Sequence, residues 1–205
     1  MVRLLNRRTI ENLNYIETVD KIVIFNNHIR TFWSRAEGWA PIKAADLLSK
    51  SRLDWLVSLS HSLYNWKEET NDNAIQGDLI LAWANLGALV EGNMKFFLSV
   101  YYEDYKADKN IPMRWNKQVD PDSTMMNELI LFFNKSIWDD TEKEDKSNWL
   151  KEVQQKRNAI HAYKDRDIGN FHLFRQHVKT YLLFLLNLLS RVPYPDDIYG
   201  PDLSF

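Results

Sequence analysis

Two side chains in the last third of the sequence, Arg157 and His161, are of the types that act on a phosphodiester. They lie in the segment 156–161, which reads KRNAIH. Each residue turns an α-helix by about 100°, so side chains four residues apart share a face. A guanidinium can hold a phosphate through two contacts, and an imidazole can move a proton at a 2′-hydroxyl or a leaving oxygen. These are the minimum parts for RNA cleavage without a metal.

The surrounding charge is compatible with RNA, although other interpretations stay open. Between Lys151 and Lys179 the chain has seven Lys or Arg against three acidic residues. A second basic stretch contains Trp115 as a stacking surface, together with Lys109, Arg114 and Lys117. That stretch also fits solvated lysines around a core or capping Trp. A helical Arg–His pair is likewise common as an ordinary surface or capping feature.

Long segments with helical spacing must position these residues, because only six Gly and six Pro interrupt the chain. We expect six helices, over about 9–35, 44–68, 78–105, 124–138, 147–163 and 170–191. Ile22–Phe25 is β-prone, so a short strand is an alternative there. Gly87 and Gly92 lie inside the third helix, where each weakens the helix by up to about 1 kcal/mol relative to Ala. We therefore expect a neighbouring helix to approach closely at both positions. The acidic and basic run at 139–146 fits an exposed linker.

The fold class expected from these segments is all-α: one domain built as a bundle of about six helices. Residues 1–43 would add an N-terminal helix to the bundle, 44–192 would form the bundle itself, and 193–205 would be a C-terminal tail. The last helix is apolar on most of its circumference between Tyr181 and Leu189. Such a helix is either central or shared with a second subunit, so we expect a homodimer that uses the fifth or sixth helix.

Several function classes lack their sequence signals. The net charge of −2 creates no general attraction to nucleic acid, so phosphate binding needs a local basic patch. Without cysteine there can be no disulfide or thiolate site. No His-Glu-x-x-His motif or Gly-rich phosphate loop occurs, so we expect no metal and no cofactor. Met1–Arg8 lacks the apolar run of a signal peptide, and Tyr181–Leu189 is about half a membrane span. We expect a cytoplasmic protein with no membrane segment.

The segment 156–163 (KRNAIHAY), which leads into a long apolar helix, resembles HEPN domains. In that family an Arg, a following polar residue and a later His form a ribonuclease site on a helical bundle. The run 88–98 (ALVEGNMKFFL) is similar to the family's helix with an acidic residue beside the core. The resemblance spans roughly 44–191. It implies that Arg157, Asn158 and His161 are catalytic, with Glu91 and Lys156 in support.

One feature departs from the family. The usual spacing leaves four to six residues between the Arg and the His, whereas three lie between Arg157 and His161. Arg166 and His172 have a permitted spacing and are the second choice, although Gly169 is expected to break the helix between them. Glu91 is also interpreted as an ordinary ion-pair partner on a long helix.

The resemblance implies an RNA-binding protein or metal-independent endoribonuclease of a bacterial defence or toxin system. It also implies a homodimer with two Arg–His pairs across a two-fold interface, and a neutralising partner protein. The alternative is a catalytically silent helical dimer that serves as a protein–protein or nucleotide-binding module.

Overall fold

The computed structural model describes residues 7–68, 73–161 and 163–202. Of these residues 71% are helical, which confirms the all-α fold class. The α-helices are α1 (Arg7–Asn12), α2 (Tyr15–Trp33), α3 (Ile42–Lys50), α4 (Leu53–Ser62), α5 (Ile75–Val100), α6 (Tyr102–Ala107), α7 (Met126–Phe132), α8 (Lys143–Arg157) and α9 (Phe171–Leu189). Shorter elements are the 3₁₀ turns η1 (Leu63–Trp66), η2 (Pro121–Ser123), η4 (Asn158–His161) and η5 (Asp197–Tyr199), the π-turn η3 (Phe133–Ile137), and the strands β1 (Met113–Arg114) and β2 (Lys117–Gln118).

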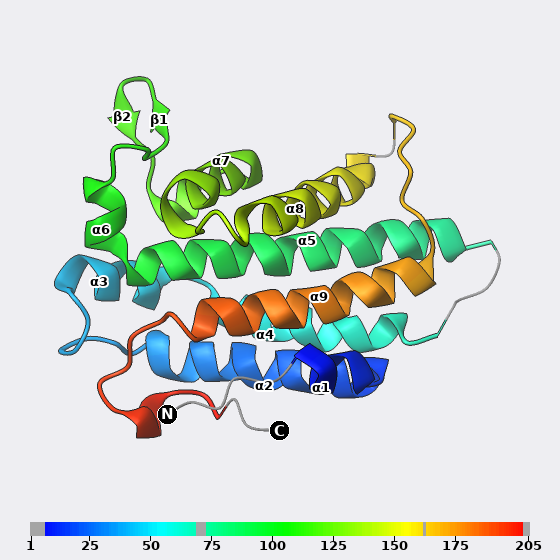
Figure 1. Ribbon diagram of the computed structural model, residues 1–205, viewed down its shortest axis with the longest axis horizontal. Coiled ribbons are helices and arrows are strands. Elements are labelled where there is room, and N and C mark those ends of the chain that lie inside the picture. Colours follow the sequence, from blue (N-terminus) through cyan, green and yellow to red (C-terminus); the bar gives the residue numbers. More distant parts are fainter. Residues whose placement is uncertain (1–6, 69–72, 162, 203–205) are drawn as a thin grey trace.

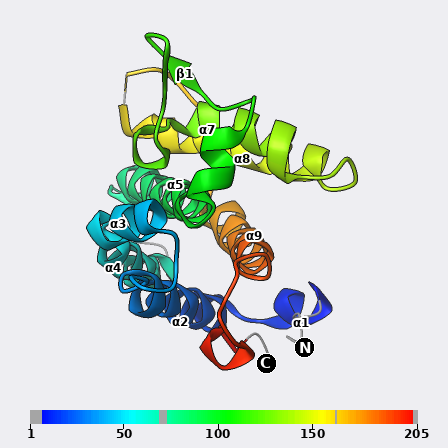
Figure 2. The same cartoon turned by 90° about the vertical axis from the view of Figure 1, so that its left-hand side faces the viewer.

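Four long helices, α2, α4, α5 and α9, form the central bundle. The helix α2 contacts α4 and α9, and α5 contacts the same two helices, so the four close a ring. The helices α7 and α8 form a further layer, on the side of α5 that faces away from α2 (Figures 1 and 2). The helix α5 therefore lies between the bundle and this layer, and it contacts α3, α4, α6, α7, α8 and α9.

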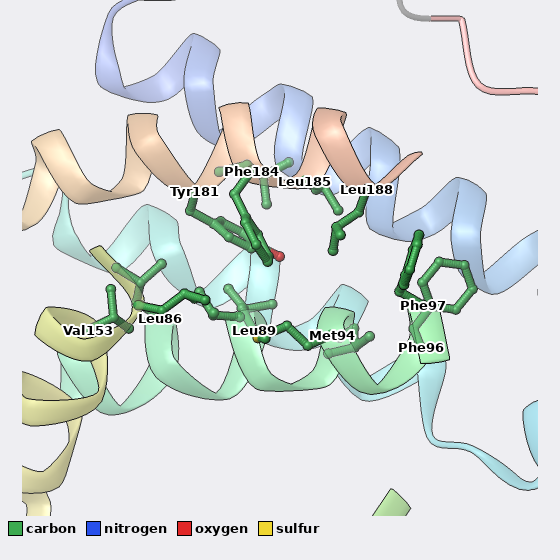
Figure 3. Packing of buried hydrophobic residues seen from close by; sticks show 14 of the residues in the cluster. Leu86, Leu89, Met94, Phe96, Phe97, Val153, Tyr181, Phe184, Leu185 and Leu188 are labelled. Carbon is green, nitrogen blue, oxygen red and sulfur yellow. The ribbon is translucent and has the colours of Figure 1, made fainter. Parts of the chain in front are cut away.

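The apolar face of α9 is buried inside this one chain. Its side chains Tyr181, Leu185 and Leu188 point toward Leu86 and Leu89 of α5 (Figure 3). Most of the run from 181 to 189 is buried, and each such side chain contributes about 1.5–3 kcal/mol. Of the two alternatives for this helix, a central position or a shared one, the structure shows the central position. Because α2 and α5 cover its apolar circumference, that circumference does not by itself require a second subunit.

A buried polar network joins the four central helices at one level. Tyr181 of α9 accepts hydrogen bonds from the side-chain amides of Asn93 (2.8 Å) and Asn26 (3.3 Å). Asn93 of α5 donates to Asn26 Oδ1 of α2 (3.0 Å), and Asn26 donates to Ser60 Oγ of α4 (2.9 Å). All four residues are fully buried. Each helix contributes one polar side chain, so the network specifies the register of all four.

The expected first and second helices are each divided in two. Asn14 forms a capping box with Glu17, so a new helix begins there and α1 is separate from α2. The β-prone segment Ile22–Phe25 lies inside α2. At Ser51 the backbone becomes extended, with ψ of 141°, and this ends α3 before α4 begins. The uninterrupted helices predicted over 9–35 and 44–68 are therefore wrong.

Other boundaries also differ from the prediction. The third helix stops at Val100, because Tyr101 leaves the helical region (ψ 38°) before α6. The helix α8 begins at Lys143, so Ser147 is a buried residue within it rather than its cap. The run 139–146 is thus only partly a linker: Lys146 is half-buried and donates to Glu142 (2.5 Å). Asn170 caps α9 by accepting from Leu173 N, as expected.

Candidate functional site

The last turn of α8 lies directly on α5, and the contact is made over a glycine. A Cβ atom at Gly87 would lie 2.7 Å from Arg157 Cδ and 2.8 Å from Arg157 Cβ. A Cβ at Gly92 would meet a terminal methyl of Leu56 on α4. Both glycines therefore lie where another helix approaches, which confirms the expectation from the sequence. At Gly87 the missing side chain makes room for the stem of Arg157.

Glu91, one turn further along α5, holds the guanidinium of Arg157. Arg157 Nη1 donates to Glu91 Oε2, and Lys95 Nζ lies 2.8 Å from Glu91 Oε1. The Glu91 side chain is 18% exposed and that of Arg157 32%. One carboxylate thus bridges two cations, so the interpretation of Glu91 as an ion-pair partner is confirmed. Arg157 is oriented by this contact while part of it stays open to solvent.

His161 and Arg157 do not share the helical face expected from the sequence. The helix α8 ends at Arg157, and Asn158–His161 form the 3₁₀ turn η4. A 3₁₀ helix turns by about 120° per residue instead of about 100°, so the two side chains diverge around the axis. His161 is exposed, and within the described chain its ring makes no hydrogen bond. The helix predicted to reach residue 163 is wrong, because α8 ends at Arg157 and His161 belongs to the following 3₁₀ turn.

Asn158 is the C-terminal cap residue of α8. Its backbone N–H donates to the carbonyls of Gln154 and Lys156. Ala159 in the same turn is buried against the core, whereas Ile160 is 42% exposed. The side chain of Asn158 is half-buried, so it borders the Arg157 position and also belongs to the end of the helix.

Lys156 points away from Arg157, into a second polar cluster that the sequence did not reveal. It is 5% exposed, and its Nζ donates to the Asp167 carbonyl (3.3 Å) and lies 3.5 Å from Glu152 Oε1. Glu152 is also 3.4 Å from His177 Nε2. Burial lowers the pKa of His177; Glu152 opposes this shift and Lys156 adds to it. Lys156 therefore supports the α8–α9 contact rather than the Arg157 site.

The second-choice pair is also separated. Arg166 lies in the loop after η4 and lines a surface hollow of about 430 Å³, shared with Glu152, Gln155, Lys156, Asp165 and Asp167. His172 is exposed in the first turn of α9, with Nε2 3.2 Å from Gln176 Nε2. Gly169 has a φ of +67°, a conformation suited to glycine, and ends the loop before α9. The expected break at Gly169 is confirmed.

The basic stretch with Trp115 forms a β-hairpin beyond α6 (Figure 1). Trp115 lies at its tip with a φ of +52° and is 95% exposed, so the core interpretation is wrong. Arg114 is engaged in an ion pair with Glu128 of α7. The hairpin is remote in sequence from Arg157, and it presents a bare indole rather than a lined groove.

Three further findings concern the chain beyond these candidate residues. Among residues 7–68, 73–161 and 163–202, no three His, Asp or Glu side chains gather in a way that would hold a metal ion. Within those same ranges no helix is long and apolar enough to cross a bilayer. Comparison with known proteins gave no match to a family model, to a curated protein or to a solved structure.

Proposed function

We propose that the chain is an HEPN-like RNA-binding protein and a metal-independent endoribonuclease whose site contains Arg157 and His161. The main support is the Glu91 carboxylate, which holds Arg157 on α5 with part of the guanidinium open to solvent. An exposed imidazole follows one short turn later in the chain. A held cation and an exposed imidazole on one short stretch of chain suit a phosphodiester better than they suit an apolar ligand.

In the proposed reaction Arg157 binds a phosphate of single-stranded RNA. His161 removes the proton of the adjacent 2′-hydroxyl, whose oxygen attacks phosphorus while the bond to the 5′-oxygen breaks. The leaving oxygen takes a proton from water or from a second imidazole. Charge that develops on the phosphoryl oxygens is neutralised by Arg157. The products are a 2′,3′-cyclic phosphate and a 5′-hydroxyl.

A homodimer is part of this proposal. Next to His161, the side chain of Ile160 is 42% exposed, and Tyr163 beyond it is fully exposed. A second copy that covered these apolar groups would bring another Arg–His pair to the same surface. A neutralising partner protein would cover the same surface.

One observation favours the alternative of a catalytically silent binding module. The guanidinium of Arg157 already has a carboxylate partner, and η4 turns His161 away from it. In that case the same surface would bind its ligand and leave the phosphodiester intact.

The test uses single-stranded RNA incubated with the purified chain in EDTA. We expect cleavage, loss of cleavage with His161→Ala while binding remains, and a rate loss of about 10²–10⁴-fold. Arg157→Ala should weaken both binding and cleavage. His61→Ala is the matched control for an exposed imidazole, since His61 lies on α4. Arg191→Ala is the control for the guanidinium, because Arg191 pairs with Glu142 at nearly the same exposure.

The outcomes separate the two functions. If the chain binds RNA in a salt-dependent way but does not cleave it, and His161→Ala binds RNA equally well, the chain is a binding module. If His61→Ala and Arg191→Ala lose as much cleavage as His161→Ala and Arg157→Ala, the losses reflect stability rather than chemistry. If the wild-type chain neither binds nor cleaves RNA, the proposal is wrong.

A further inference from the structure

A lined groove lies between α5 and the junction of α3 with α4. Its volume is about 410 Å³. One wall is the α3–α4 junction, and the other is the face of α5 that carries Gly92 and Lys95. Leu56 and Phe96 form its apolar floor, since both are buried. Sequence reasoning missed this groove, because the groove forms where the predicted continuous helix is broken at Ser51.

Trp55 offers a flat aromatic surface in this groove. The residue is 56% exposed although it lies in the first turn of α4. The guanidinium carbon of Arg52 is 4.1 Å from the centre of its ring, and Arg52 is itself held by two hydrogen bonds to Asp54 (2.9 and 2.6 Å). The indole is therefore kept in position while much of it stays free to stack on another ring.

Cations surround this aromatic surface. The groove is lined by Lys50, Arg52 and Lys95, and also by one acidic residue, Asp122. Each cation has a carboxylate partner, namely Asp46, Asp54 and Glu91 respectively. The first two pairs are more than half exposed, and exposed pairs of this kind exchange partners at little cost. A phosphate could therefore replace either carboxylate.

Lys95 links the groove to the ion pair at the proposed catalytic position. Lys95 lines the groove and also binds the same Glu91 carboxylate that holds Arg157. Two cations on one carboxylate are close neighbours, so a strand whose phosphate binds at Arg157 would pass close to Lys95. Cations beside a stacking ring are the usual composition of a single-strand binding surface.

We propose that this groove binds one nucleotide of single-stranded RNA, next to the phosphate held by Arg157. Its base stacks on Trp55, and its phosphate lies between Lys95 and Arg52. This inference rests on the proposed function, of which it names a second RNA subsite.

The test measures binding of an oligouridine of about ten nucleotides, a length within the site size of single-strand binding folds. All proteins carry His161→Ala, so that the RNA stays intact. Trp55→Ala should weaken binding about 5- to 150-fold, the range expected from loss of one stacked base. Trp55→Phe should restore most of the affinity, since a ring remains. Lys95→Gln should lower the slope of log affinity against log salt by about one.

Trp115→Ala is the matched control, because Trp115 is also an exposed indole beside basic residues. It should bind like the parent protein. Photo-crosslinking with 5-iodouridine RNA should attach to the peptide that contains Trp55. The inference is overturned if Trp55→Ala binds like Trp115→Ala, or if Trp55→Phe is folded but binds no better than Trp55→Ala.

Failure of the subsite and failure of the proposed function give different results. If RNA is bound and cut but Trp55→Ala has no effect, only the subsite is wrong. If Trp55→Ala weakens binding while the chain with its native His161 cuts no RNA, the subsite stands and the ribonuclease proposal is wrong. If the chain binds no RNA, both are wrong.

Discussion

Replacing Gly87 by Ala tests whether the approach of α8 to α5 positions Arg157. The new Cβ would lie within 2.8 Å of three side-chain carbons of Arg157, including its Cβ, which is fixed to the backbone. Relief requires α8 itself to shift, because rotation of the end of the side chain cannot move that atom. We expect both a loss of stability and a displaced guanidinium.

Two other glycines of α5 supply the comparison from which the magnitude follows. In a helix Ala is favoured over Gly by up to about 1 kcal/mol, and overpacking costs about 1–3 kcal/mol. Gly77 has no atom within 4 Å of an added Cβ, so Gly77→Ala should gain up to about 1 kcal/mol. At Gly92 the obstacle is a terminal methyl of Leu56, which can move into the adjoining groove. Gly92→Ala should therefore be close to wild type.

The assay is urea unfolding of the three variants, supported by thermal melts and RNA cleavage rates. Gly87→Ala should be about 1–3 kcal/mol less stable than Gly77→Ala, and each kcal/mol corresponds to about 2–4 °C in Tm for a chain of this size. It should also cleave RNA more slowly than Gly77→Ala, whose added Cβ meets no atom within 4 Å. If Gly87→Ala is as stable as Gly77→Ala, the contact between α8 and α5 yields easily and the reasoning is refuted.

Two further predictions concern the core. Tyr181→Phe should lower the free energy of unfolding by only about 1 kcal/mol, because the amides of Asn26 and Asn93 keep other acceptors. Asn26→Ala leaves a cavity and removes one acceptor of Asn93 together with the amide that donates to Ser60 and Tyr181, so it should cost about 2–4 kcal/mol. Equal losses for Tyr181→Phe and Asn26→Ala in urea unfolding would argue against a connected network. Burial lowers the pKa of His177 from 6.5, so the unfolded chain binds its proton more readily. That stability is complete above pH 6.5 and is lost as the pH falls toward the lower folded-state pKa. His177→Gln should flatten urea midpoints measured from pH 8 to 5, whereas the exposed His61→Gln should not.

Local sequence was enough to locate several features of the site. The spacing of apolar residues predicted α5 and α9, and the glycines of α5 indicated where neighbouring helices approach. Asn170 was recognisable as a cap because its side chain acts on its own backbone. The ion-pair role of Glu91 was also anticipated from its residue type and its flank position, although its partner was not.

The arrangement of Arg157 and His161 was beyond sequence reasoning. The run 156–161 contains no helix breaker, so periodicity predicted one continuous helix. The change to a 3₁₀ turn accompanies the burial of Ala159 and the contact of η4 with α5, two elements that lie far apart in the sequence. Lys156 and His177 likewise meet only because α8 and α9 pack together through Glu152.

Sequence alone therefore determined the class of the fold, the broad apolar surface of α9 and the sites of close helix approach, because these depend on periodicity and on residue size. Tertiary structure decided which side chains meet. Asn26, Ser60, Asn93 and Tyr181 form one network across four helices, and Lys95 connects Arg157 to the groove at Trp55. Nothing in a local window encodes such contacts, since each depends on how separate helices are packed and turned about their axes.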